Sequence, residues 1–406
     1  MKIGLLTYHA ACNFGANLQA LSTVNYWRNR GHEPIFINWV PDDLMAYYQG
    51  NTIPRQMEIH EIFRNEYFPM TRCCKTDREV AEVIKEEGIE AIVVGSDAVM
   101  KTSPKRSRFF FPTRRIISSY KPTTDAACPN PFWGSYYHLL DKKIPLCYMS
   151  ASSQNSHYRS SSVSEKKMQK DLLCQYSYIS TRDDWTANQV KWLTDGLFSP
   201  TITPDPVFAF NYNVKQQPTA EEIKKRFNLA DKYCLFSFHS SRVVPTAWMQ
   251  EAQDKLNAKG IQCVAFPFPQ GVQFKHPFEK EIGLPLSPLD WYYLIKYADA
   301  YIGENMHPIV IALHNAVPCF SFDQYGKVKL RYFVNDKSSK IYHILNHFGC
   351  IDNRVSIQGN YKIPTVDFVL SRLESYDRKK VQKQAEVYLE HYKKMMLDIE
   401  DVITNK

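Results

Sequence analysis

Residues 2–39 read KIGLLTYHAACNFGANLQALSTVNYWRNRGHEPIFINW. Residues 2–8 are an apolar run that fits a buried parallel strand, and residues 34–39 are a second such run. Between them, apolar side chains recur at near-helical spacing, at Leu18, Leu21, Val24 and Trp27. Gly31 is placed to end that helix. The stretch therefore predicts a β-α-β unit, the building block of a parallel sheet.

The same alternation continues in two consecutive series. Further strand-like runs lie at 90–94, 146–149 and 178–180, and then at 234–238, 261–266, 300–302 and 318–322. Gln216-Gln217-Pro218 has the composition of a linker between the series. We therefore predict an α/β protein with two Rossmann-like domains facing a central cleft, at 1–215 and 216–406. The amphipathic segment 375–405 predicts a C-terminal helix that packs back on the first domain.

Residues 100–133 interrupt this alternation within the first domain. They contain consecutive phenylalanines, several prolines and a group of basic residues that includes Lys101, Lys105, Arg106, Arg108, Arg114 and Arg115. The stretch predicts a long basic insertion near the ligand edge of the sheet. A solvated loop is the favoured interpretation, and a lid or binding loop for an anionic glycan is the alternative.

Composition argues against several classes of protein. The chain has 406 residues and a net charge of +8, which is mild for its length, and no nucleic-acid-binding module is recognisable. The 10 cysteines are scattered without a CxxC pair, so we expect neither a metal site nor a disulfide framework. The absence of GxGxxG and GxxxxGK[ST] loops argues against dinucleotide oxidoreductases and P-loop NTPases.

The sequence also indicates a location. The chain starts with a strand-like run rather than a signal peptide, and no apolar run is long enough to span a bilayer. We therefore expect a cytoplasmic protein. The amphipathic C-terminal segment leaves open a peripheral association at the inner face of the membrane.

Candidate site residues are those that follow the predicted strands, because ligands of doubly wound sheets bind beyond the carboxyl ends of the strands. In the first domain they include Asn13, Asn17, Asp97, Ser152 and Arg182. In the second domain they include His239, Arg242, Asn305, His307 and Lys327.

His307 is the most informative of these residues. Pro308 behind it fits the first turn of a helix, so we predict that His307 lies at a helix N-terminus. The free N–H groups there attract an anion, and an imidazole can donate a proton beside it. A structural helix-capping histidine is an equally weighted alternative.

The charged candidates have more ordinary alternatives. Arg182 and Lys327 are suited to holding a carboxylate or phosphate, although a surface ion pair would explain either one alone. Glu304, Asp97 and Asp205 are candidate bases. The last of these precedes a proline and fits better as a turn residue.

Seven short motifs occur in an order that resembles one known family. They are Asn13-Phe14-Gly15-Ala16-Asn17-Leu18-Gln19, Val94-Gly95-Ser96-Asp97, Ile179-Ser180-Thr181-Arg182-Asp183, Asp205-Pro206-Val207, Ser287-Pro288-Leu289, Met306-His307, and the stretch from Pro318 to Lys327. Each motif alone is weak, but the ordered set covers most of the chain. It resembles the polysaccharide pyruvyl transferases.

The resemblance implies a glycosyltransferase-B-like fold in which the first domain binds the acceptor and the second the donor. It implies transfer of the enolpyruvyl unit of phosphoenolpyruvate to a sugar of a cell-surface glycan or its lipid-linked precursor, with no other cofactor and no metal. By residue matching, the resemblance implies that His307 is the acid or a donor contact and that Arg182 and Lys327 hold the donor anion. Because of their positions after the predicted strands, His239, Arg242 and Asn305 are further donor-binding candidates, and Asn13, Asn17, Asp97 and Ser152 are acceptor-binding candidates.

Two positions depart from the family pattern. Asn305 stands where many members have arginine, which removes one expected contact with phosphoenolpyruvate. Pro308 stands where glycine is usual, which removes a backbone N–H. His239 or Arg242 would compensate. Two other functions stay open, a nucleotide-sugar-dependent glycosyltransferase on the same fold and a non-catalytic glycan-binding or assembly subunit.

Overall fold

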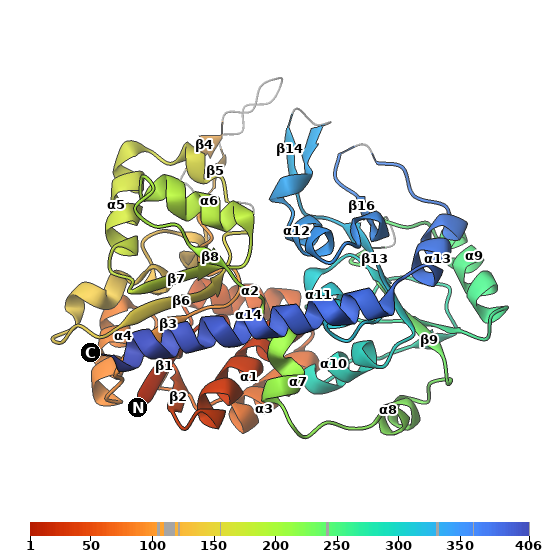
Figure 1. The fold of residues 1–406 in the computed structure, drawn as a ribbon, viewed down its shortest axis with the longest axis horizontal. Helices are drawn as coiled ribbons and strands as arrows, with labels where there is room; N and C mark the ends of the chain where they lie inside the picture. Colours follow the sequence, from red (N-terminus) through yellow and green to blue (C-terminus); the bar gives the residue numbers. More distant parts are fainter. Residues whose placement is uncertain are drawn as a thin grey trace.

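The computed structural model describes residues 1–103, 106–108, 118–120, 122–154, 156–240, 243–329, 333–359 and 361–405. In this part of the chain, two six-stranded sheets form the centres of two domains (Figure 1). Neighbouring strands in both sheets run parallel. The predicted α/β fold with two Rossmann-like domains is confirmed.

The two sheets follow one plan. The first has the order β2-β1-β3-β6-β7-β8 and the second β11-β10-β9-β12-β13-β16. The strands of the first are β1 (Lys2–Leu6), β2 (Glu33–Phe36), β3 (Ala91–Val94), β6 (Leu146–Ala151), β7 (Tyr178–Thr181) and β8 (Thr201–Ile202). Those of the second are β9 (Tyr233–Ser237), β10 (Gln262–Ala265), β11 (Lys280–Glu281), β12 (Ala300–Gly303), β13 (Cys319–Asp323) and β16 (Arg354–Ser356). The inner strands β3, β6, β9, β12 and β13 are buried throughout, as expected for parallel strands covered on both faces.

Helices connect the strands. The first domain has α1 (Phe14–Asn29), α2 (Asp42–Asn51), α3 (Pro54–Tyr67), α4 (Asp77–Glu86), α5 (Val163–Leu173), α6 (Asp184–Leu193) and α7 (Phe210–Asn213). The second has α8 (Ala220–Phe227), α9 (Thr246–Asn257), α10 (Pro288–Lys296), α11 (Met306–His314), α12 (Lys340–His347) and α13 (Val366–Glu374). Capping boxes begin α4, α5 and α8, so local sequence sets these N-termini.

One apolar core extends through both domains. Its members include Leu5, Phe14 and Leu18 of the first domain and Leu235 and Trp291 of the second. The rings of Phe14 and Trp291 stack across the boundary with centroids 5.2 Å apart. The Phe14 N–H also donates to the carbonyl of Pro269, at 3.0 Å. The two domains are therefore joined by a packed interface.

The C-terminal helix α14 (Arg378–Thr404) returns across the molecule from the second domain to the first (Figure 1). It contacts α11 as well as β6 and β7. Near its end, Glu400 accepts hydrogen bonds from Arg30 Nε and His32 Nε2, at 2.9 and 3.0 Å. None of the described helices is both long and apolar enough to cross a membrane.

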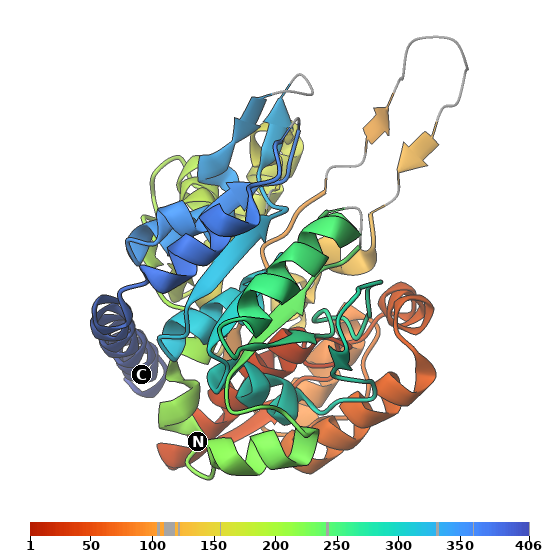
Figure 2. The same ribbon diagram turned by 90° about the vertical axis from the view of Figure 1, so that its right-hand side faces the viewer.

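The predicted insertion at 100–133 is more ordered than a simple loop. Its backbone forms an antiparallel pair, β4 (Arg106–Arg108) and β5 (Ser118–Tyr120), which projects from the body of the molecule (Figure 2). Its end differs from the expected loop, because Phe132 and Trp133 are buried in the core of the first domain. Lys105, Arg114 and Arg115 lie outside the described residues.

Candidate active site

His307 lies in the first turn of α11, as its neighbour Pro308 predicted. Asn305 is the N-cap of this helix, and its Oδ1 accepts a hydrogen bond from the His307 N–H at 3.2 Å. The side chain that caps α11 is therefore that of Asn305, and the imidazole of His307 does not cap the helix. The imidazole is buried, and its Nε2 has no hydrogen-bond partner among the described residues.

The imidazole of His307 packs against Gly15 at the start of α1. A Cβ atom at position 15 would lie closer than 3.0 Å to three ring atoms of His307. Glycine is therefore required for this close approach. The contact brings the first motif of the N-terminal domain against the histidine motif of the C-terminal domain.

The protonation of His307 follows from its surroundings. Burial lowers its pKa to about 4, and the charges of Lys340 and Arg182 add to this effect. The carboxylates of Asp97 and Asp205 act in the opposite direction. The imidazole is therefore neutral near pH 7 when no ligand is bound.

Arg182 follows β7 and lies in the same interior. Its Nη1 donates to Asp205 Oδ2 at 2.6 Å, and its Nη2 reaches Asp97 Oδ1 at 3.5 Å. Burial opposes the charge of Arg182, but the nearby carboxylates raise its pKa, so it stays cationic. Its Nε has no hydrogen-bond partner among the described residues. The predicted donor-binding cation is thus held in a buried ion pair.

The two carboxylates differ in their other contacts. Asp205 accepts from Gln19 Nε2 at 2.5 Å and from the backbone N–H of Val207 at 3.0 Å. It therefore combines the predicted turn role with the ion pair to Arg182. Burial acts to raise the pKa of Asp97, but Arg182, His307 and Lys340 together lower it. Asp97 is ionised at neutral pH.

Lys340 is a functional candidate that sequence reasoning missed. It begins α12, is buried, and its Nζ lies 4.5 Å from the centre of the Tyr325 ring. Burial, together with the charge of Arg182, lowers its pKa to about 8, although nearby carboxylates act in the opposite direction. One sequence signal could have indicated this lysine. It follows the N-cap Ser339 directly, and a positive charge is unfavourable at the N-terminus of a helix.

Three of these groups, Arg182, Asp205 and Lys340, line a small cavity between the domains. It has a volume of about 160 Å³ and is lined by Arg182 and Asp205 of the first domain and by Met306 and Lys340 of the second. Gln384, Tyr388 and His391 of α14 close one side. His307 is not among the residues that line this cavity, but the charges of Arg182, Asp205 and Lys340 all act on its pKa. The structure therefore places three predicted residues, Arg182, Asp205 and His307, near the unpredicted lysine.

A second cavity of about 190 Å³ lies on the side of the first domain. Asn13 and Asp97 line it together with the aromatic side chains of Tyr8 and Tyr48. Asn13 also caps α1, accepting from the Ala16 N–H at 3.2 Å. Two of the four predicted acceptor-binding residues thus share one opening, and Asp97 connects it with the Arg182 ion pair.

The other two predicted acceptor-binding residues are buried. Asn17 accepts from His60 Nδ1 at 2.6 Å and donates to the carbonyl of His9 at 3.0 Å, so the structure places it in the interior of the first domain. Ser152 donates to Asp183 Oδ2 at 3.0 Å. Its side chain supports the residue that follows Arg182.

The remaining donor-side candidates do not lie in the described part of the cavity wall. His239 is exposed, and its backbone N–H donates to Glu304 Oε1 at 3.3 Å. Burial raises the pKa of Glu304 to about 7, and this hydrogen bond partly offsets the rise. Arg242 lies outside the described residues, and the side chain of Lys327, which begins β14 (Lys327–Lys329), also lies outside them.

The family model for polysaccharide pyruvyl transferases matches residues 13–324. The chain belongs to the polysaccharide pyruvyl transferase family. The matched range begins at Asn13, which caps the helix that contacts His307, and includes Arg182 and His307 themselves. No curated protein matches the sequence.

Solved structures similar to this chain include UDP-GlcNAc 2-epimerases. The UDP-GlcNAc 2-epimerase from Neisseria meningitidis bound to UDP-GlcNAc has a TM-score of 0.55 at 9% identity, with 98% of this chain and 99% of that chain covered. The UDP-GlcNAc 2-epimerase from Methanocaldococcus jannaschii has a TM-score of 0.53 at 10% identity, with 95% and 99% covered. The likeness is one of fold, and the predicted glycosyltransferase-B-like architecture is confirmed.

Proposed function

We propose that this member of the family moves the enolpyruvyl unit of phosphoenolpyruvate onto two hydroxyls of a sugar. The observation that supports this most is that Arg182 and Lys340 line one cavity between the domains, with the buried His307 close enough for both charges to lower its pKa. A small anion with a carboxylate and a phosphate needs fixed cations and a proton donor. These three side chains supply both.

The proposed reaction begins with protonation of the donor. A proton is added to the methylene carbon of phosphoenolpyruvate, and the first sugar hydroxyl attacks the adjacent carbon and loses its proton. Phosphate then leaves with the C–O bonding electrons. The second hydroxyl attacks the same carbon and loses its proton, which closes the ketal. The products are a pyruvate ketal and inorganic phosphate.

His307 is the proposed acid. It is neutral in the free protein because burial lowers its pKa. A bound phosphoenolpyruvate brings several negative charges beside the ring, which favours the imidazolium form. The proton therefore arrives together with the donor, and the acid is charged only when there is a substrate to protonate.

Lys340 and Arg182 are the proposed donor anchors, and Asp97 is the proposed acceptor-side base. Asp97 lines the cavity of the first domain and also reaches the Arg182 guanidinium. A hydroxyl that attacks a cationic carbon needs only a weak base, so the lowered pKa of Asp97 is compatible with this role. The aromatic walls of that cavity suit the face of a sugar ring.

The test uses the purified full-length chain with phosphoenolpyruvate and a panel of free and lipid-linked sugars. We expect phosphate release together with a product that has gained pyruvate less one water. H307Q should lower both signals by about a hundredfold or more, whereas H138Q, at an exposed histidine of the first domain, should not lower them.

Calorimetric titrations with phosphoenolpyruvate and with UDP-GlcNAc distinguish the proposed reaction from the main alternative, a nucleotide-sugar-dependent glycosyltransferase. Binding of the nucleotide sugar with no binding of phosphoenolpyruvate would overturn the proposal in favour of a glycosyltransferase. Binding of phosphoenolpyruvate without any release of phosphate across the acceptor panel would favour a non-catalytic subunit.

A further inference from the structure

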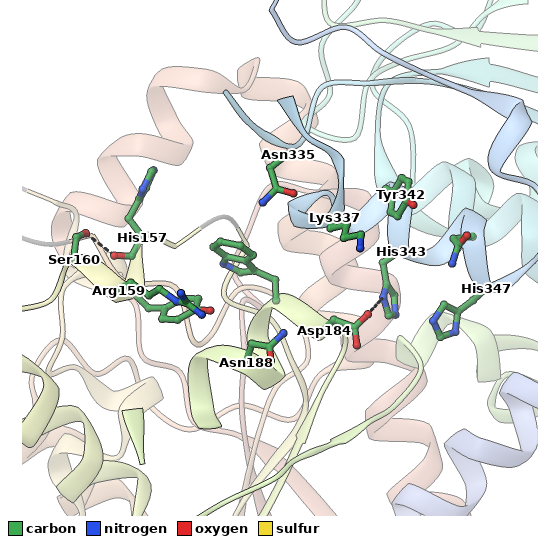
Figure 3. A pocket seen from close by; sticks show the side chains of 13 residues that line it. His157, Arg159, Ser160, Asp184, Asn188, Asn335, Lys337, Tyr342, His343 and His347 are labelled. Carbon is green, nitrogen blue, oxygen red and sulfur yellow. Dashed lines mark hydrogen bonds and ion pairs between the residues drawn. The ribbon is translucent and has the colours of Figure 1, made fainter. Parts of the chain in front are cut away.

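Three side chains with metal-binding atoms meet in the cleft between the domains. Asp184 begins α6 in the first domain, and His343 and His347 are one turn apart on α12 in the second (Figure 3). Their ligand atoms all lie within 4.8 Å of one another. His343 Nδ1 is 3.1 Å from Asp184 Oδ2, and the two imidazole centroids are 4.3 Å apart.

These side chains stand at the junction of two cavities. All three line a large cleft of about 1110 Å³, whose walls also carry Arg159 of the first domain and Lys337 of the second (Figure 3). His343 and His347 also line the smaller cavity that contains Lys340 and Arg182. The three-residue group therefore faces the space through which a ligand would approach the candidate active site.

We propose that Asp184, His343 and His347 bind one divalent transition-metal ion between the two domains, with Zn²⁺ as the best fit. Two imidazoles and one carboxylate suit Zn²⁺, whereas Mg²⁺ and Ca²⁺ prefer oxygen ligands. Tetrahedral bonds of about 2.0–2.1 Å place ligand atoms about 3.3 Å apart. The 3.1 Å pair already meets that spacing, and the exposed side chains of Asp184 and His347 can rotate to close the rest.

The site would act on the cleft in two ways. An ion held by α6 and α12 joins the two domains at the mouth of the candidate active site. Three protein ligands also leave one position for water or for an anionic oxygen of a molecule in the cleft. Arg159 and Lys337 give the surrounding wall the positive charge that suits such an anion.

This proposal revises the expectation of no metal that the sequence suggested. The histidines are four residues apart, but the aspartate precedes them by more than 150 positions in the chain. Only the packing of the two domains brings these residues together.

The test is a Co²⁺ titration of the chelator-treated full-length protein, followed by visible absorption, with Zn²⁺ as competitor. We expect one ion per chain with a spectrum of nitrogen and oxygen ligands. H343Q, H347Q and D184N should each weaken binding at least about tenfold. H138Q is the matched control, and circular dichroism checks that each variant is folded.

A second readout is thermal unfolding, because an ion that binds the folded chain raises the midpoint. Zn²⁺ should raise it in the unchanged protein and in H138Q, but not in H347Q. The proposal is overturned if the chain binds no ion, or if H343Q and H347Q bind the ion as tightly as the unchanged protein does. Thiolate absorption bands that survive in those variants would overturn it as well, because they would assign the ion to the exposed Cys73 or Cys174.

Discussion

The buried histidine His60 makes the stability of the first domain depend on pH in a predictable way. It is fully buried on α3, and its Nδ1–H donates to Asn17 Oδ1 at 2.6 Å. Its Nε2 has no hydrogen-bond partner among the described residues. Protonation would place an unpartnered N–H and a charge in the interior, close to Arg64. Burial, with a smaller contribution from Arg64, therefore lowers the pKa of His60 to about 3.

The sign and size of the effect follow from linkage. The unfolded chain binds the proton with a pKa near 6.5, whereas the folded chain does not bind it until about pH 3. The contribution of His60 to the free energy of unfolding is therefore fully present above pH 6.5 and is lost as the pH falls below that value. Between pH 7 and pH 5 the loss is about 2 kcal/mol.

The assay compares urea unfolding of the unchanged protein and H60N at pH 7 and pH 5. Asparagine keeps a donor near the position of Nδ1 but does not titrate. Other titrating groups, such as Glu304 with its raised pKa, are present in both proteins. Their contributions to the free energy of unfolding therefore cancel when the two proteins are compared. We expect the unchanged protein to lose about 2 kcal/mol more than H60N over this range.

Two controls keep the comparison sound. H138Q tests whether losing any histidine has the same effect, and H60Q replaces H60N if the latter does not fold. Coincident fluorescence and circular dichroism transitions are required before free energies are compared. Equal losses in the unchanged protein and in the His60 variant would refute the assignment of a neutral, buried imidazole.

Three further predictions concern the candidate active site. H307Q should lower kcat by about a hundredfold to ten-thousandfold, which is the usual contribution of a general acid. The unfolding midpoint should change little. A kcat near normal would show that His307 takes no part in the chemistry. G15A should displace the same imidazole and lower kcat by about a hundredfold, while binding of phosphoenolpyruvate measured by calorimetry changes less. Lys340, with a pKa of about 8, loses its charge as the pH rises, so KM for phosphoenolpyruvate should increase above pH 8. K340R should flatten that increase and K340M should raise KM at all pH values, and an unchanged profile in K340R would contradict the role of Lys340.

The fold was predictable because its pattern is local. Apolar runs and helical spacing marked both series of strands, and Pro308 marked the start of α11. The position of a residue after a strand did not reveal where its side chain points. Asn17 turns into the interior to meet His60, whereas Asn13, four residues earlier, lines a cavity. Both sit in the same short motif.

Residues brought together by the packing of distant elements were not predictable from spacing. Lys340 begins a helix rather than following a strand, so a survey of strand ends passed over it. Arg182 was expected to hold an anion of the donor or to form a surface ion pair. Its actual partner is the buried Asp205, which the sequence indicated as a turn residue or a candidate base. Phe132 and Trp133 are buried among side chains from many parts of the first domain, which the basic residues earlier in the same insertion did not indicate.

The apolar core that Phe14 and Trp291 share has a mechanical consequence. Hinge bending between the two halves would expose this packed surface to water, which costs about 25 cal/mol for each Å² of apolar area. Rigid-body opening is therefore unfavourable, unlike in proteins whose halves meet through a thin polar contact. We therefore expect substrates to enter through movement of loops and side chains around the two cavities, and we expect the shape of these openings to contribute to selectivity.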